Sequence, residues 1–269
     1  MSEILTVKSG DIVLRALDYG GCRPPDILLL HGLAGRGRER AATAEWLTSY
    51  GRVVALDQRG HGDSRDGVRN LSRDAYVQDV IATIEQKLSA PVVLVGQSMG
   101  GLHAFLAAAR RPDLVRLLVI VEATPEPDPS VQLQIRRWLS NWPVPFLSRA
   151  AAQAFFGGDS LYARTFAESL DEVPDGYRAA FELDHMVRAI ADVTATSYWP
   201  EWEKVSCPTL LVGGETSFVS ADLLRRMAQS NPACQYVQVS GAGHDLHLET
   251  PTEWRRTLCD FLQRHEVNG

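Results

Sequence analysis

The sequence lacks the features of secreted and membrane-spanning proteins. Its first residues, Met1 to Thr6, contain no basic stretch followed by an apolar core, so we expect no secretory signal. No apolar run approaches the roughly 20 residues that a transmembrane helix requires. These absences argue against a membrane protein and favour a cytoplasmic location.

Cysteine is scarce and scattered. The chain has four cysteines, and no two of them form a C-x-x-C pair. They are Cys22, Cys207, Cys234 and Cys259. Isolated cysteines of this kind are typical of reduced, structural thiols rather than of a disulfide framework. A histidine pair at His244 and His247 has no further clustered ligands around it in the sequence, so we expect neither a metal nor a cofactor.

Basic residues are not in excess. The chain has 27 lysine and arginine residues against 33 aspartate and glutamate residues, a formal net charge of −6. Nucleic acids and anionic membrane surfaces attract basic proteins, so this balance argues against both partners. A small molecule is the expected partner, and the sequence leaves the oligomeric state open. With 269 residues, 45% of them hydrophobic, the chain can form one large domain or one domain with an insertion.

Strand and helix patterns alternate along most of the chain. The run at 26–30 is almost continuously apolar, as a strand buried on both faces should be. The expected strands are 12–17, 26–30, 52–56, 91–95, 115–121, 209–212 and 236–239, and the expected helices are 38–50, 72–88, 102–109, 220–229 and 251–264. Repeated strand–helix units with buried strands predict an α/β fold with a doubly wound, mostly parallel sheet.

One stretch interrupts this alternation. Between residues 123 and 205 we expect no buried strand; Pro125, Pro127 and Pro129 begin the stretch, and amphipathic helical segments follow. An insertion of this length cannot be a simple crossover, and long insertions are often functional lids. We therefore predict an α/β core formed by 1–122 and 206–269, with a helical cap formed by 123–205.

A five-residue motif points to the chemistry. Gly96-Gln97-Ser98-Met99-Gly100 is a G-x-S-x-G sequence between an expected strand and an expected helix, the setting of a nucleophile elbow. Glycines on both sides of the serine allow a sharp turn. The turn places the Ser98 hydroxyl at a helix N-terminus, where negative charge is favoured. Ser98 is therefore the candidate nucleophile.

Three further blocks complete a pattern. They are His31-Gly32-Leu33-Ala34-Gly35 after an expected strand, the stretch from Asp57 to Ser64, and Gly241-Ala242-Gly243-His244-Asp245 before the last helix. With them the chain resembles the α/β-hydrolase superfamily along nearly its whole length. The resemblance implies His244 as general base and the backbone N–H groups of Leu33 and Met99 as an oxyanion hole. It assigns His31, Asp57 and His61 to loop structure rather than to catalysis.

The acid that should orient the histidine departs from the family pattern. The family acid is expected within Gly214-Glu215-Thr216-Ser217, where Ser217 takes the place of an aspartate. A serine has no full charge with which to stabilise an imidazolium. Glu122, at the end of the strand 115–121, is the first candidate for the acid, and Glu215 is the second. The sequence leaves this choice open.

Serine at the elbow indicates the type of reaction. Family members that cleave carbon–halogen bonds or epoxides use an aspartate there, whereas a serine indicates acyl transfer through an acyl-enzyme. We expect a serine hydrolase that cleaves an ester or lactone of a small, largely apolar substrate. Trp138, Trp142 and Trp199 of the cap are the expected pocket residues.

Other functions remain compatible with these residues. A thioesterase or a hydrolase of C–C bonds would use the same side chains, and a haloperoxidase-like or perhydrolase side activity would replace water by peroxide. A non-catalytic ligand-binding receptor of the same fold is the alternative from another class. The serine at position 217 is the one feature that favours it.

Overall fold

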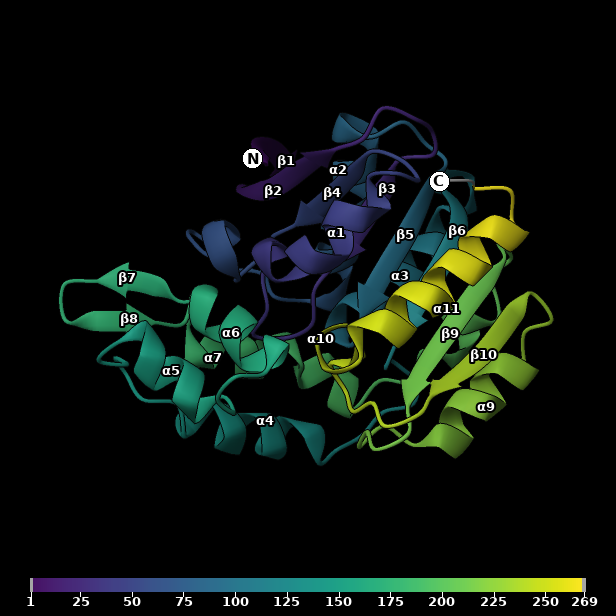
Figure 1. Ribbon diagram of the computed structural model, residues 1–269. Helices are drawn as coiled ribbons and strands as arrows, with labels where there is room; N and C mark the ends of the chain where they lie inside the picture. Colours follow the sequence, from purple (N-terminus) through teal and green to yellow (C-terminus); the bar gives the residue numbers. More distant parts are fainter. Residues whose placement is uncertain (1, 268–269) are drawn as a thin grey trace.

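The computed structural model describes residues 2–267 and contains a twisted eight-stranded sheet (Figure 1). Its strands, in spatial order, are β1 (Glu3–Ser9), β2 (Ile12–Gly20), β4 (Val53–Leu56), β3 (Ile27–Leu30), β5 (Val92–Gln97), β6 (Val115–Val121), β9 (Thr209–Gly214) and β10 (Cys234–Val239). Only β2 runs against the others, because it pairs antiparallel with both β1 and β4. The predicted α/β fold with a mostly parallel sheet is confirmed.

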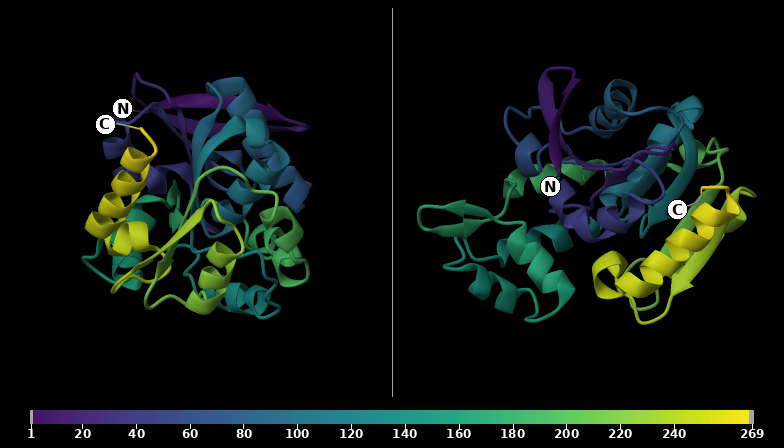
Figure 2. Two further views of the ribbon diagram at one scale, coloured as in Figure 1. Left: turned by 90° about the vertical axis from the view of Figure 1, so that its right-hand side faces the viewer. Right: turned by 45° about the horizontal axis from the view of Figure 1, so that its top comes forward.

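Helices cover both faces of the sheet. On one face lie α2 (Arg73–Lys87), α3 (Met99–Arg110) and α9 (Ala221–Gln229), and on the other lie α1 (Ala41–Leu47) and α11 (Pro251–Arg264), as the left view of Figure 2 shows. Successive side chains of β3 alternate between these layers: Leu28 and Leu30 pack toward α2 and α3, whereas Ile27 and Leu29 pack toward α1 and α11. Burial on both faces explains why this strand is continuously apolar.

Serine side chains cap the starts of two helices, at the positions where the expected ranges 72–88 and 220–229 begin. Ser72 accepts a hydrogen bond from the Ala75 backbone N–H at the start of α2. Ser220 accepts one from the Leu223 backbone N–H at the start of α9. Each serine satisfies an N–H that has no partner within the helix, so each fixes where its helix begins.

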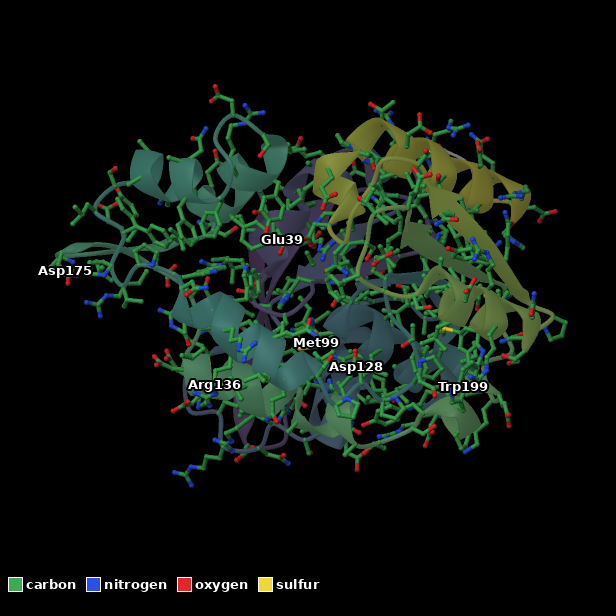
Figure 3. The ribbon with its side chains drawn as sticks, turned by 90° about the horizontal axis from the view of Figure 1, so that it is seen from below. Glu39, Met99, Asp128, Arg136, Asp175 and Trp199 are labelled. Atoms are coloured by element: carbon green, nitrogen blue, oxygen red, sulfur yellow. The ribbon has the colours of Figure 1, made fainter. Side chains whose placement is uncertain are left out.

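Residues 123–205, here called the inserted segment, lie beyond the carboxyl ends of β5 and β9 (Figure 1). The segment contains α4 (Val131–Ser140), α5 (Arg149–Phe155), α6 (Leu161–Glu168), the hairpin strands β7 (Asp171–Val173) and β8 (Gly176–Arg178), α7 (Leu183–Ala189) and α8 (Trp199–Trp202). Asp175, in the turn between β7 and β8, marks its outer end in Figure 3. Its buried aromatic and aliphatic side chains form a cluster that also includes Ala34 and Leu248 of the core. No helix found in residues 2–267 is long and apolar enough to cross a membrane.

Polar contacts attach the inserted segment to the core. The Arg36 guanidinium lies 2.8 Å from a carboxylate oxygen of Asp63 and 2.9 Å from one of Asp171, and the Arg36 side chain is almost fully buried. The Gly62 backbone N–H donates to the Ala180 carbonyl at 2.8 Å. These contacts hold the hairpin end of the segment against two loops at the edge of the sheet.

Candidate active site

Ser98 lies in a strained turn between β5 and α3. Its backbone has φ 53° and ψ −120°, a conformation that non-glycine residues rarely adopt and that is concentrated at functional sites. A Cβ atom at Gly96 would lie 2.2 Å from the Gly100 carbonyl oxygen, and one at Gly100 would lie 2.6 Å from the His31 carbonyl oxygen. Only glycine fits these two positions. The turn therefore forms the elbow that the motif predicted, with Ser98 partly exposed at its tip.

The end of the neighbouring strand places a carboxylate beside this turn. The Ser98 backbone N–H donates to the Val121 carbonyl at 2.7 Å, so the residue after β5 and the residue after β6 are adjacent. The latter is Glu122, whose backbone adopts a left-handed φ of 57°. Non-glycine residues in this region are worth examining for function.

His244 meets this carboxylate from the loop after β10. Its Nδ1 atom lies 3.1 Å from Oε2 of Glu122, whose side chain is 0% exposed, while the His244 side chain is 20% exposed. The Phe218 ring covers His244 at a centroid distance of 4.4 Å. A carboxylate on Nδ1 fixes the ring tautomer and leaves Nε2 for proton exchange with a nucleophile. The geometry thus matches a general base with its orienting acid.

The Ser217 side chain forms a hydrogen bond to Glu122 rather than to His244. Its hydroxyl makes a short hydrogen bond to Oε2 of Glu122, the same oxygen that faces His244. The Gly214 backbone N–H donates to the other oxygen at 2.6 Å. Burying a carboxylate is costly unless its oxygens are hydrogen-bonded, and these donors satisfy both oxygens.

Glu215, the second candidate for the acid, points elsewhere. Its carboxylate accepts hydrogen bonds from the Ser240 hydroxyl at 2.7 Å and from the Gly241 backbone N–H at 2.8 Å. These two bonds lower the pKa of Glu215. The structure therefore brings Glu122, and not Glu215, into contact with His244.

The loop that contains Leu33 packs directly on the elbow. A Cβ atom at Gly32 would lie 2.3 Å from Oε1 of Gln97 and 3.4 Å from Cβ of Ser98. The Leu33 side chain packs against a buried cluster that contains Met99. Within residues 2–267, neither the Leu33 nor the Met99 backbone N–H donates a hydrogen bond to a protein group. Both candidate oxyanion donors are thus placed next to Ser98.

The other polar residues of the motifs form hydrogen bonds within the loops. His31 Nε2 accepts a backbone N–H from the loop after β4 at 3.0 Å, and burial lowers the pKa of His31 well below its usual value. Asp57 accepts the backbone N–H groups of Gly37 at 2.6 Å and of Asp63 at 2.8 Å. His61 is fully buried, which lowers its pKa to about 4. These contacts support the structural roles that the sequence indicated.

The three tryptophans predicted for the pocket have different surroundings. Trp142 is buried in the aromatic cluster of the inserted segment, and Leu33 packs against this cluster. The rings of Trp142 and Trp138 meet edge to face, with their centroids 5.3 Å apart. Trp199 lies on α8, where its indole N–H donates to Glu126 at 2.5 Å. In Figure 3, Trp199 and the inserted-segment residue Arg136 lie on opposite sides of Met99. A pocket role remains a prediction for all three tryptophans.

Sequence reasoning missed a buried polar group behind His244. Ligand atoms of Glu39, Asp245 and His247 lie within 4.8 Å of one another, a spacing that could hold a metal ion. An arginine already balances this group, since the Arg40 guanidinium lies 3.4 Å from a carboxylate oxygen of Glu39. Although burial raises it, the nearby Arg40 charge lowers the pKa of Glu39 to about 2. A residue pattern does not distinguish such buried charges from solvated ones, so no signal in the sequence identified them.

Comparisons with known proteins agree with this geometry. Residues 27–257 match the model of the Alpha/beta hydrolase family. The chain is 26% identical over 264 residues to a 2-(acetamidomethylene)succinate hydrolase of Mesorhizobium japonicum, covering 95% of this chain and 94% of that protein. It is 30% identical over 251 residues to the serine hydrolase BPHL of Mus musculus, covering 88% of this chain and 79% of that protein.

A solved structure is similar over the same extent. The crystal structure of an E-2-(acetamidomethylene)succinate hydrolase superimposes with a TM-score of 0.88 at 25% sequence identity, covering 98% of this chain and 100% of that one. The family model spans most of the sequence and includes the elbow, Glu122 and His244. The chain therefore belongs to the α/β-hydrolase family and is a hydrolase.

Proposed function

We propose that this chain is a serine hydrolase that cleaves an ester or lactone of a small, largely apolar substrate without a cofactor. The observation that carries the proposal is the 3.1 Å contact between His244 and the buried Glu122, beside the strained elbow of Ser98. A nucleophile, a base and an orienting acid at the carboxyl ends of β5, β10 and β6 are the parts that acyl transfer requires.

The reaction follows from the placement of these groups. The Ser98 Oγ atom attacks the substrate carbonyl carbon while its proton passes to Nε2 of His244, and Glu122 stabilises the resulting imidazolium. The Leu33 and Met99 amides stabilise the oxyanion, and the loss of one such donor typically costs about 3–4 kcal/mol in the transition state. The alkoxide leaves with the proton of His244, which forms the acyl-enzyme. Water then attacks the acyl carbon through the same base, which releases the acid and restores Ser98.

The inserted segment supports the choice of an apolar substrate. Its aromatic cluster, which contains Trp142 and is edged by Trp138, packs against the candidate oxyanion loop at Leu33. We infer that this segment caps the site and that its apolar side chains bind the non-reacting part of the substrate. The first relative described above is named for a different substrate, so only the reaction class is carried over to this chain.

The test is covalent labelling combined with turnover. A fluorophosphonate probe should label the wild-type protein on Ser98, as shown by mass mapping, and p-nitrophenyl acetate and butyrate should be hydrolysed. Label and turnover should disappear in Ser98→Ala and in His244→Ala, while both variants keep the wild-type circular dichroism spectrum. A folded wild-type protein that takes no label would overturn the proposal and favour a ligand-binding member of the family.

A further inference from the structure

The side chain of Gln97 contacts the loop of His244. Its Nε2 atom donates to the His244 carbonyl oxygen at 3.3 Å and to Oδ1 of Asp245 at 3.2 Å. Its Oε1 atom accepts from the Arg40 guanidinium at 3.0 Å. The Gln97 residue is 3% exposed, so these protein groups satisfy its amide in place of water.

The partners determine which way this amide points. Arginine can only donate, so the oxygen of Gln97 must face Arg40. The carbonyl of His244 can only accept, and an ionised Asp245 likewise only accepts, so the NH2 group must face them. Burial raises the pKa of Asp245 to about 6, which leaves it mainly ionised at neutral pH. The hydrogen bonds of Gln97 are thus mutually consistent.

The groups behind Gln97 are themselves anchored. Arg40 lies 3.4 Å from the Glu39 carboxylate, and Nε2 of His247 lies 2.9 Å from the same carboxylate. His247 belongs to α10 (Leu246–Glu249), which begins two residues after His244. All three side chains are buried. A continuous polar chain therefore runs from Gln97 through Arg40 and Glu39 to the helix that follows the His244 loop.

A second contact holds the loop from its other side. The Glu249 carboxylate accepts the Gly243 backbone N–H at 2.5 Å and the Asp245 backbone N–H at 3.1 Å. These two N–H groups flank His244, so Glu249 fixes the local shape of the loop. Glu249 belongs to α10, and among residues 2–267 it forms no hydrogen bond to the elbow. The hydrogen-bonded link between this loop and the residue next to Ser98 is made by Gln97.

We propose that Gln97 is a positioning residue whose amide sets the place of His244 relative to Ser98, with Asp245 as its acceptor. Gln97 and Ser98 are consecutive residues at the end of β5, so a bond from Gln97 to residues 244 and 245 fixes the base relative to the nucleophile. Gly32 of the oxyanion loop also packs against Oε1 of Gln97. This role rests on the proposed serine hydrolase function.

The test exchanges the amide and the carboxylate. Gln97→Glu turns a donor into an acceptor that faces the His244 carbonyl and Asp245, and we expect kcat for p-nitrophenyl butyrate to fall about 100-fold, the cost of a displaced catalytic group. Asp245→Asn keeps an acceptor and should lower kcat less than tenfold. The double variant restores a donor–acceptor pair between positions 97 and 245, and its kcat should exceed that of Gln97→Glu at least tenfold, with KM changed little.

Three measurements, kcat, Tm and fluorophosphonate labelling, separate the possible results. Gln229→Glu, an exposed change of the same kind on α9, is the control for added charge and should leave kcat and Tm unchanged. If Tm shows coupling between positions 97 and 245 but kcat does not, the residue is only structural and the proposal is overturned. A Gln97→Glu variant with wild-type kcat would overturn it as well. If the wild-type protein takes no fluorophosphonate label, the proposed function fails instead, while the Tm coupling still reports on the hydrogen bond.

Discussion

The carboxyl edge of the sheet and the inserted segment approach the same site but are held by different interactions. At the sheet edge, backbone hydrogen bonds connect consecutive strand ends: Ser98 to Val121 at 2.7 Å and Glu122 to Val212 at 2.9 Å. The outer end of the inserted segment is held mainly by side chains, chiefly the ion pairs of Arg36, with one backbone bond from Gly62 to Ala180, and it leaves Leu147 85% exposed. Backbone pairing cannot rearrange without unfolding, whereas side-chain contacts can separate. We infer that the chemistry is placed on the strand ends joined by backbone bonds, and that the inserted segment contributes to substrate selection.

The largest expected effect concerns the acid at the sheet edge. Glu122→Ala should lower kcat about 10⁴-fold, because His244 loses the charge that stabilises its imidazolium. Ser217 already contacts the Glu122 oxygen that faces His244, so an aspartate there lies near the ring. The double variant Glu122→Ala with Ser217→Asp should therefore have a kcat at least tenfold higher than that of Glu122→Ala alone. Glu215→Ala is the matched control, and a loss as large as that of Glu122→Ala would contradict the assignment.

Glycine replacements compare the two regions by stability. Gly96→Ala places a Cβ atom 2.2 Å from a backbone carbonyl of the elbow and should cost about 3 kcal/mol or more of unfolding free energy. Gly158, in the inserted segment, also has a positive φ of 73° but has nothing within 4 Å of the added atom. Gly158→Ala should cost only about 1–2 kcal/mol, the strain of the left-handed backbone. Urea unfolding measures both, and equal losses would mean that the elbow tolerates more movement than its geometry indicates.

Removing the attachment of the inserted segment should have a smaller, local effect. Arg36→Gln leaves the carboxylates of Asp63 and Asp171 without their buried cation, but both remain partly exposed, so we expect a loss of about 1–2 kcal/mol. Hydrogen exchange should rise mainly in β7 and β8, and KM should increase more than kcat falls. Arg178→Gln removes the exposed ion pair with Asp175 and is the control. It should leave the hydrogen exchange of β7 and β8 and the value of KM unchanged. Faster exchange throughout the sheet would show that the segment is not an independent unit.

The effect that vanishes at neutral pH is a pH dependence of stability that originates in the core. Burial lowers the pKa of His247 to about 4, below its usual 6.5. Between these values the unfolded chain binds the proton and the folded chain does not, so stability falls as the pH drops from about 6.5 toward 4. One such group contributes at most about 1.4 kcal/mol per pH unit. His247→Gln should make the decrease of Tm over this range shallower, and an unchanged slope would show that His247 is not buried in its neutral form.

The parts that the sequence predicted are those in which the backbone requires particular residues. Gly96 and Gly100 fit a turn that admits no side chain, and the apolar β3 fits a strand covered on both faces. The strand β1 went unpredicted because it is an edge strand with alternating exposure, which resembles a polar segment. The choice of Glu122 over Glu215 depended on which side chain reaches His244, and such a distance is set by tertiary packing.

The burial of Glu39 and Arg40 could not be predicted from the sequence, because it too depends on tertiary packing. Glu39 and Arg40 follow a glycine-rich loop at the start of a helix, where charged residues are ordinarily solvated. Their burial arises because the loop after β10 folds over them, a contact between residues far apart in the chain.

The most direct test of acyl transfer at this site is the mass of the protein quenched with acid within milliseconds of mixing with p-nitrophenyl butyrate. If Ser98 is the nucleophile held by His244 and Glu122, the quenched protein should carry one butyryl group on the peptide that contains Ser98, with a matching burst of p-nitrophenol. Steady hydrolysis with no acyl group on Ser98, or with the group on another residue, would contradict the assignment.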